Sequence, residues 1–110
     1  MLLPMTFVSC NPATGAVFFT RPAWTPAQLD QHLDALRAAQ LRWRRQPVAE
    51  RCATLLALSQ QLLAHRDELA ALIAGEVGKL IGECRAEVEK SAKLCHYYAE
   101  LAPQLLAPQA

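Results

Sequence analysis

The pattern of hydrophobic positions divides the chain into a short extended part and a longer helical part. Residues 6–10 and 16–21 are rich in Val, Phe and Thr, the residue types that favour β-strands. Between them lies Asn11-Pro12-Ala13-Thr14-Gly15, in which Asn hydrogen-bonds its own turn, Pro fixes its φ and Gly accepts a positive φ. The pattern predicts a β-hairpin over residues 6–21. Because an isolated hairpin is only marginally stable in water, we expect it to pack against another part of the protein.

A first helix is predicted over residues 25–46. Thr25-Pro26-Ala27-Gln28 is a strong helix start, with Thr as N-cap, Pro at the first helical position and Gln at the capping-box position. Pro47 then ends this helix or begins the next one. Apolar side chains recur at helical spacing on one face, namely those of Leu29, Leu33, Leu36 and Trp43.

Apolar residues also follow helical spacing over residues 48–75. The periodicity wavers at His65-Arg66-Asp67, which predicts either one helix with a break there or two helices that meet at an angle. Gly75 and Gly78 are expected to mark the C-terminal end, with Gly78 in a left-handed conformation.

A last helix is predicted over residues 80–102. Its apolar stripe consists of Leu80, Cys84, Val88, Cys95 and Tyr98. Pro103 and Pro108 are expected to mark its end and to leave residues 103–110 as an unstructured tail. The predicted fold is therefore mainly α with an N-terminal β-hairpin, in a single domain of 110 residues.

Composition and charge mainly exclude certain functions and locations for the protein. Net charge is +1, so no overall field recruits nucleic acid or an anionic membrane. The start, Met1-Leu2-Leu3-Pro4-Met5, has no basic region and no long apolar run, so it does not read as a secretory signal. No stretch approaches the roughly 20 apolar residues that span a bilayer, and we expect a cytoplasmic protein. The four cysteines lack metal-ligand spacing and are expected to be inert buried thiols.

None of the candidate catalytic or ligand-binding motifs has the spacing that its chemistry requires. Glu76-Val77-Gly78-Lys79 lacks the earlier Gly and the following Ser or Thr of a phosphate-binding loop, and no set of the 4 glycines has dinucleotide-binding spacing. Ser59, His65 and Asp67 have the types of a hydrolytic triad, but on one helix Ser59 and His65 point in widely separated directions. We therefore assign no catalytic, cofactor-binding or metal-binding residue in this chain.

Several short segments in a fixed order nevertheless resemble a known family. They are Asn11-Pro12-Ala13-Thr14-Gly15, Trp43-Arg44-Arg45-Gln46-Pro47 followed by Glu50-Arg51, Arg66-Asp67-Glu68-Leu69-Ala70, Glu76-Val77-Gly78-Lys79 and Tyr97-Tyr98-Ala99-Glu100. Together they resemble the N-terminal stretch of the NAD(P)-dependent aldehyde dehydrogenases, and within that family the bacterial succinate-semialdehyde dehydrogenases. Leu80, Ala16 and Cys52 depart mildly from the family pattern, where Pro, Glu and Ala are usual.

The resemblance implies a fragment of an α/β, Rossmann-like cofactor-binding domain in which these helices serve as scaffold. It implies NAD or NADP as the cofactor of the full-length family and none for this chain alone. It also implies oxidation of an aldehyde, succinate semialdehyde in the branch named above, by residues further along a longer polypeptide. The expected partner is the remainder of the dehydrogenase chain, or another copy through apolar helix faces. The alternative function is an autonomous helical protein-interaction module.

Overall fold

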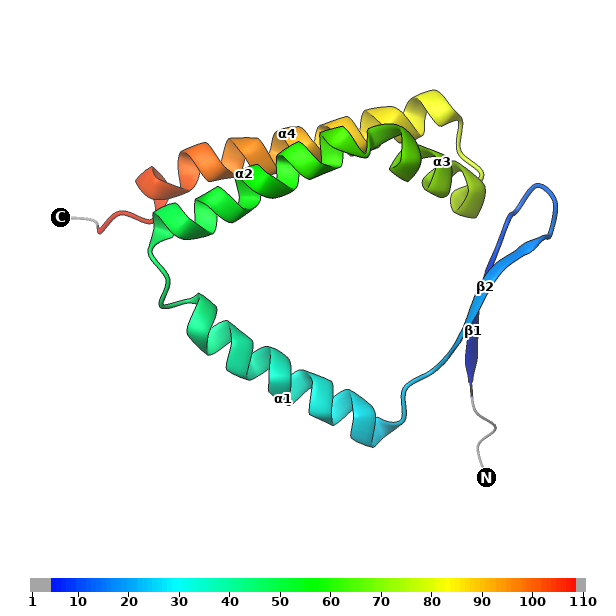
Figure 1. Cartoon of the computed structure of the whole chain (residues 1–110), viewed down its shortest axis with the longest axis horizontal. Coiled ribbons are helices and arrows are strands. Elements are labelled where there is room, and N and C mark those ends of the chain that lie inside the picture. Colours follow the sequence, from blue (N-terminus) through cyan, green and yellow to red (C-terminus); the bar gives the residue numbers. More distant parts are fainter. Residues whose placement is uncertain (1–4, 109–110) are drawn as a thin grey trace.

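The computed structural model describes residues 5–108 and contains a hairpin followed by four helices. The elements are β1 (Thr6–Cys10), β2 (Val17–Pro22), α1 (Pro26–Trp43), α2 (Val48–Ala64), α3 (Arg66–Val77) and α4 (Ile81–Leu105). The prediction that the start of the chain is not a secretory signal rests mostly on residues 1–4. These residues lie outside the described residues, as do residues 109 and 110. The predicted architecture, mainly α with an N-terminal hairpin, is confirmed (Figure 1).

The hairpin forms where the sequence predicted it, and its connection uses the expected turn chemistry. The Asn11 side chain accepts a hydrogen bond from the Ala13 amide at 2.8 Å, and Gly15 has a φ of 73°. The strands are antiparallel, and Ser9 faces Phe19 whereas Cys10 faces Val17. Phe18 is therefore the extra residue of a β-bulge, which bends the strand and redirects its side chain.

This bulge sets the hairpin against the C-terminal end of α3. A Cβ atom on Gly75 would lie 2.9 Å from Cζ of Phe18, so only glycine admits the ring this close. At the hairpin tip, Gly78 has a φ of 76° and a Cβ there would lie 2.7 Å from Cγ of Pro12. The prediction of a left-handed Gly78 is confirmed. The prediction that Gly75 marks the helix end is wrong, because α3 continues through it to Val77.

The start of α1 is the predicted capping box, but the helix buries nothing. The Gln28 amide donates to Oγ1 of Thr25 at 3.2 Å, and the Thr25 amide donates to Oε1 of Gln28 at 2.9 Å. The helix ends at Trp43 rather than at residue 46, because a turn at Arg44 and Arg45 leads into Pro47. No residue of α1 is buried, and the helix lies apart from the others (Figure 1).

The core lies between α2 and α4, which run antiparallel side by side (Figure 1). Its buried residues are small, which lets the two backbones approach closely. They are Cys52 and Ser59 from α2, Ala70 from α3, and Cys84, Val88, Ala92 and Ala99 from α4. Oγ of Ser59 donates a hydrogen bond of 2.8 Å to the carbonyl oxygen of Ala92, which satisfies the one buried polar side chain of this core within the described residues.

The structure decides between the alternatives for one predicted helix and corrects the end of another. The segment predicted as a helix over 48–75 is two helices that meet at His65, which has a φ of −103° and ψ of 17°. This is one of the two alternatives that the wavering periodicity left open. The helix predicted over 80–102 continues through Pro103 to Leu105, so Pro103 neither ends it nor begins a tail. In the last turn a proline removes a single backbone hydrogen bond and its fixed φ still suits a helix.

The elements leave an open frame rather than a compact globule (Figure 1). The radius of gyration over Cα atoms is 18.8 Å, whereas a compact chain of this length has about 13 Å. The chain exposes 9066 Å² of surface, against about 6,000 Å² for a compact monomer of this mass. About 3,000 Å² of surface is thus exposed that a compact fold of this chain would bury.

Candidate functional site

The polar residues that the sequence singled out serve structural contacts. Ser59 is buried against Ala92, as described above, and Nδ1 of His65 lies 3.1 Å from Oε2 of Glu68. Asp67 accepts hydrogen bonds from arginines. The structure does not bring Ser59, His65 and Asp67 together into a triad, because each is engaged with a different partner.

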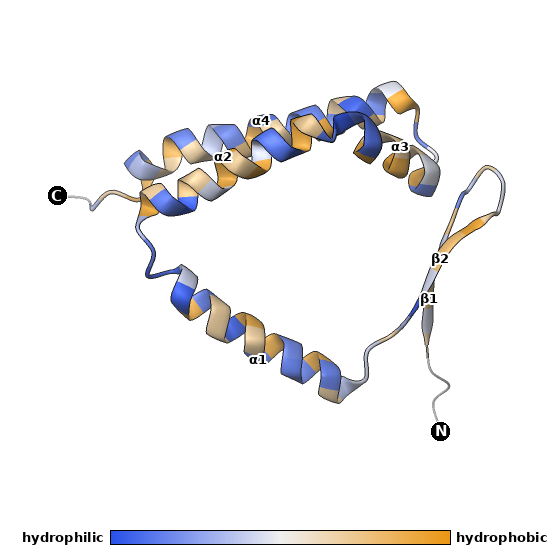
Figure 2. Ribbon diagram, in the orientation of Figure 1, coloured by the Kyte–Doolittle hydropathy of each residue, from blue (hydrophilic) through white to orange (hydrophobic). Residues whose placement is uncertain are grey.

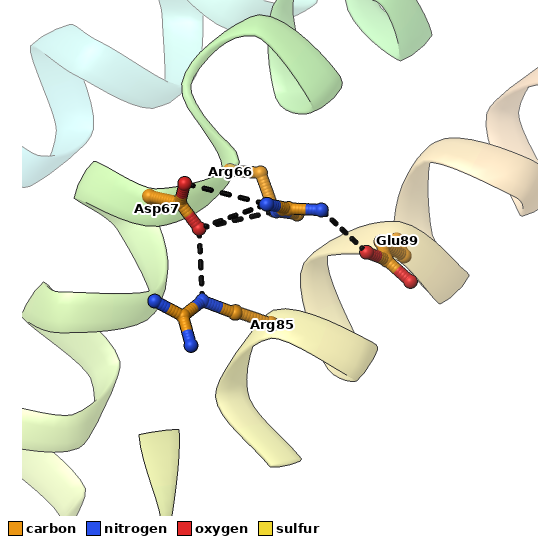
Figure 3. A network of polar contacts seen from close by, with 4 residues as sticks. All are labelled: Arg66, Asp67, Arg85 and Glu89. Carbon is orange, nitrogen blue, oxygen red and sulfur yellow. Dashed lines mark hydrogen bonds and ion pairs between the residues drawn. The ribbon is translucent and has the colours of Figure 1, made fainter. Parts of the chain in front are cut away.

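Asp67 belongs to a network that sequence reasoning missed (Figure 3). Nε of Arg85 donates to Oδ1 of Asp67 at 2.9 Å, and Nε of Arg66 donates to the same oxygen at 3.2 Å. Nη1 of Arg66 donates to Oε1 of Glu89 at 3.0 Å. Figure 3 shows the four side chains bridging the start of α3 and α4. Every side chain of the network is more than a third exposed to solvent. Because exposed ion pairs contribute little to stability, the main effect of the network is to orient α3 relative to α4.

The network shifts the acidity of its members. Hydrogen bonds from Arg66 and then from Arg85 lower the pKa of Asp67, and hydrogen bonds to Asp67 and then Glu89 raise the pKa of Arg66. At the other end of α3, a hydrogen bond to Glu87 raises the pKa of Lys79. These shifts stabilise the charged forms, which is the signature of ion pairs and not of an acid or base prepared for catalysis.

A pH dependence follows from the lowered pKa of Asp67. The folded carboxyl ionises at lower pH than the unfolded one, so its stabilising effect is present at neutral pH and is lost as pH falls through the carboxyl range. We predict that Asp67→Asn lowers the melting temperature at neutral pH and has no effect in strong acid. Melting curves by circular dichroism from neutral to acid pH would show the two curves converging. Asp34→Asn on α1 is the matched control; a difference between Asp67→Asn and wild type that persists in acid would contradict the prediction.

The cofactor-binding geometry of a dinucleotide fold does not fit the described residues. Such a site needs a glycine-rich turn that leads from a strand into the open N-terminus of a helix. The only strand-to-helix passage in residues 5–108 leads from β2 to α1. It contains no glycine, and Thr25, Pro26 and Gln28 cap the start of the helix. The same residues contain no group of three or more His, Cys, Asp or Glu that could hold a metal ion.

The feature that remains is apolar surface (Figure 2). Figure 2 shows hydrophobic residues along β2 and interspersed along α1. The apolar face of α1 consists of Leu29, Leu33, Leu36 and Trp43, and these side chains are 42–65% exposed. Leu80 and Tyr98, which the sequence placed on the apolar stripe of the last helix, are 74% and 47% exposed, and Leu80 precedes the first residue of α4.

Shallow depressions mark the places where α1 joins its neighbours. One, with a volume of about 290 Å³, lies where β2 leads into α1, and one of about 240 Å³ lies where α1 leads into α2. The second is lined by Trp43, Val48, Cys52 and Leu55 together with Arg51, whose buried Nε has no hydrogen-bond partner within the described residues. A buried donor without a partner is costly, so this end of α2 is suited to receive an oxygen acceptor from another segment.

Comparison with known proteins indicates what kind of protein carries this exposed apolar surface. The sequence matches the aldehyde dehydrogenase family over residues 4–110. The chain belongs to the aldehyde dehydrogenase family. It is 35% identical over 103 residues to succinate-semialdehyde dehydrogenase (NADP(+)) of Deinococcus radiodurans, covering 94% of this chain and 22% of that protein. It is 40% identical over 100 residues to succinate semialdehyde dehydrogenase (NAD(P)+) Sad of Escherichia coli K12, covering 90% of this chain and 21% of that protein.

The fold agrees with the sequence match. A crystal structure of succinic semialdehyde dehydrogenase from Streptococcus pyogenes in complex with NADP+ superposes with a TM-score of 0.85 at 28% identity. The superposition covers 92% of this chain and 22% of that one. The chain thus spans about a fifth of the length of the dehydrogenases that it matches. The open frame and the exposed apolar face of α1 belong to one piece of a much larger family fold, and the resemblance stated from the sequence is confirmed.

Proposed function

We propose that this chain forms the N-terminal part of an enzyme that oxidises an aldehyde to the corresponding acid with NAD or NADP. The observation that carries the proposal is the 35–40% identity to two succinate-semialdehyde dehydrogenases over at least 90% of this chain. The same relatives favour succinate semialdehyde as the substrate, and the NADP+ in the Streptococcus pyogenes structure supports a nicotinamide cofactor.

Within such an enzyme this chain is a scaffold. Ser59, His65 and Asp67 are each engaged with a different partner, and the start of α1 does not fit a dinucleotide, so the nucleophile, the base and the cofactor loop belong to the remainder of the polypeptide. That remainder covers the apolar face of α1 and supplies an acceptor to Nε of Arg51. The roughly 3,000 Å² of excess surface falls in the range of obligate interfaces, which bury about 2,000–5,000 Å².

Two further observations concern the compartment. No helix within residues 5–108 is long and apolar enough to cross a membrane. All four cysteines are free thiols. Cys52 and Cys84 are buried as predicted, but Cys10 is exposed on the hairpin and Cys95 is half-buried, so the prediction that all four are buried is wrong. Free thiols are the norm in a reducing compartment, which supports our proposal that the enzyme is cytoplasmic.

The native protein tests this proposal. An antibody raised against this chain is expected to detect, in the source cells, a species much larger than 12.1 kDa. That species, once purified, should reduce NADP+ or NAD+ when succinate semialdehyde is added, with the one-carbon-shorter malonate semialdehyde as the comparison substrate. The 110-residue chain alone should reduce neither cofactor. Detection of a 12.1 kDa species only, or a large species without aldehyde-dependent reduction, would overturn the proposal.

A further inference from the structure

One arginine of the helical part has no anionic partner among the described residues. Nε of Arg51 is buried and makes no hydrogen bond there, which is costly for a donor. Arg66 and Arg85, by contrast, each donate to a carboxylate, at 3.0 and 2.9 Å. Arg51 is also the fourth residue of α2, where the positive end of the helix dipole disfavours a cation. Both features favour an anionic partner for Arg51.

Arg51 lies in the depression of about 240 Å³ that is formed by the ends of three helices. Trp43 ends α1, Val48 begins α2, and Leu106 follows the last residue of α4. Figure 1 shows the start of α2 beside the end of α4. The apolar walls are open to solvent, since Trp43 is 42% and Leu106 58% exposed. Arg51 as a whole is only half-buried, so its guanidinium can be approached from this side.

The side chains around Arg51 define the chemistry of an occupant. Apart from Arg51 itself, the lining is apolar and contains no acidic residue: Trp43, Val48, Cys52, Leu55, Ala102 and Leu106. A free hydrated anion would exchange its water for one cation and apolar walls, which is unfavourable. A carboxylate on a peptide segment fits better, because it can form a bidentate pair with the guanidinium while apolar neighbours in the segment cover the walls.

We propose that this depression receives an aspartate or glutamate side chain, flanked by apolar residues, from the part of the dehydrogenase polypeptide outside residues 5–108. This rests on the proposed function, because the larger polypeptide supplies the occupant. The chain spans about a fifth of the dehydrogenases that it matches. It superposes on one of them with a TM-score of 0.85, so the same backbone frame occurs inside a much larger polypeptide that has segments available to cover it.

A second copy of this chain fits the depression less well. A two-fold axis through it would bring Arg51 close to its own equivalent, and the two like charges would repel. Because the lining contains no carboxylate, neither copy would supply through this surface the acceptor that the other lacks. Pairing with a different surface of the second copy would give rings or open filaments instead of a closed dimer. These arguments favour the larger polypeptide as the source of the carboxylate.

Arg51→Lys in the larger native species tests the proposal by identifying the partner. A carbodiimide joins a lysine amine directly to a carboxylate in contact with it, and peptide mass spectrometry identifies both residues. We expect position 51 to be joined to one Asp or Glu outside residues 5–108. A mixture of ordinary and isotope-labelled protein shows whether both residues belong to one chain. Arg44→Lys is the matched control, because Arg44 is exposed just before α2 and should not be joined to the same residue.

Arg51→Leu supplies a second measurement that does not depend on cross-linking. It leaves the partner's carboxylate buried without its cation, so the melting temperature of the larger species should fall by several degrees at neutral pH. The loss should shrink as the pH falls, because burial without a cation raises the pKa of a carboxyl group, which then becomes neutral by taking up a proton. Arg44→Leu should show no such pH-dependent loss.

Three results would overturn the proposal. They are the absence of a cross-link at position 51 beyond that of Arg44→Lys, a cross-link only to residues 5–108 or to a second chain, and a loss of melting temperature in Arg51→Leu that is equal at every pH. The aldehyde assay on the same purified protein separates this proposal from the proposed function. Aldehyde-dependent reduction without the cross-link contradicts the docking site alone, and the cross-link without reduction contradicts the activity alone.

Discussion

Ala92→Leu is expected to lower the free energy of unfolding by about 1–3 kcal/mol. Ala92 is fully buried between α2 and α4, and its carbonyl accepts the 2.8 Å hydrogen bond from Ser59. A leucine adds three carbon atoms where the two backbones lie close together. It can be accommodated only if the helices move apart, which also weakens the Ser59 bond. Urea unfolding followed by far-UV circular dichroism measures the change.

Ala86→Leu is the matched control for this substitution. Ala86 lies on the same helix and is exposed, so the same side chain is added there without any packing cost. Since Ala and Leu both favour helix, we expect the control to stay within about 0.5 kcal/mol of wild type. Equal stability of the two variants would show that α2 and α4 do not pack through Ala92, and the proposed core would be wrong.

Local signals could be read from the sequence because neighbouring residues determine them. The capping box of Thr25 and Gln28 depends on four consecutive positions, and the left-handed Gly78 depends on the absence of a side chain. The hairpin turn at Asn11 is of the same kind. Each of these elements therefore appears where it was predicted.

The helix ends were harder to predict, because a helix ends where a non-helical backbone conformation becomes lower in free energy than a further helical residue. Pro103 was expected to stop α4, yet a proline in the last turn loses only one hydrogen bond and the helix continues to Leu105. Trp43 ends α1 earlier than expected because the turn before Pro47 begins at Arg44. Neither outcome is visible in apolar periodicity.

The core could be predicted only in part, because periodicity identifies an apolar face but not what covers it. Cys84 and Val88 were placed on a packing stripe and are buried. The positions that bring α2 and α4 together, however, include Ser59, Ala92 and Ala99, which are too small to stand out in a hydrophobic pattern.

The exposed α1 leads to the second large expected effect. We predict that backbone amides of α1 exchange with deuterium on the order of 100-fold faster than those in the middle of α4. An 18-residue helix that buries no residue is held mainly by its own hydrogen bonds, and it lacks the tertiary packing that supplies most of the stability of helices in proteins. Around Val88 and Ala92, α4 packs on α2 and α3, so exchange there needs the helices to separate.

Hydrogen-exchange mass spectrometry on peptides from α1 and α4 measures this ratio directly. Leu33→Ala provides a control within α1: its side chain is 52% exposed, so truncation should leave α1 exchange nearly unchanged. Equal protection of α1 and α4 in the wild-type chain would mean that α1 is covered in solution, and loss of that protection in Leu33→Ala would identify the apolar face of α1 as the covered surface. In the larger native species proposed above, the same amides should become protected, because the remainder of the polypeptide then packs against Leu33 and its neighbours.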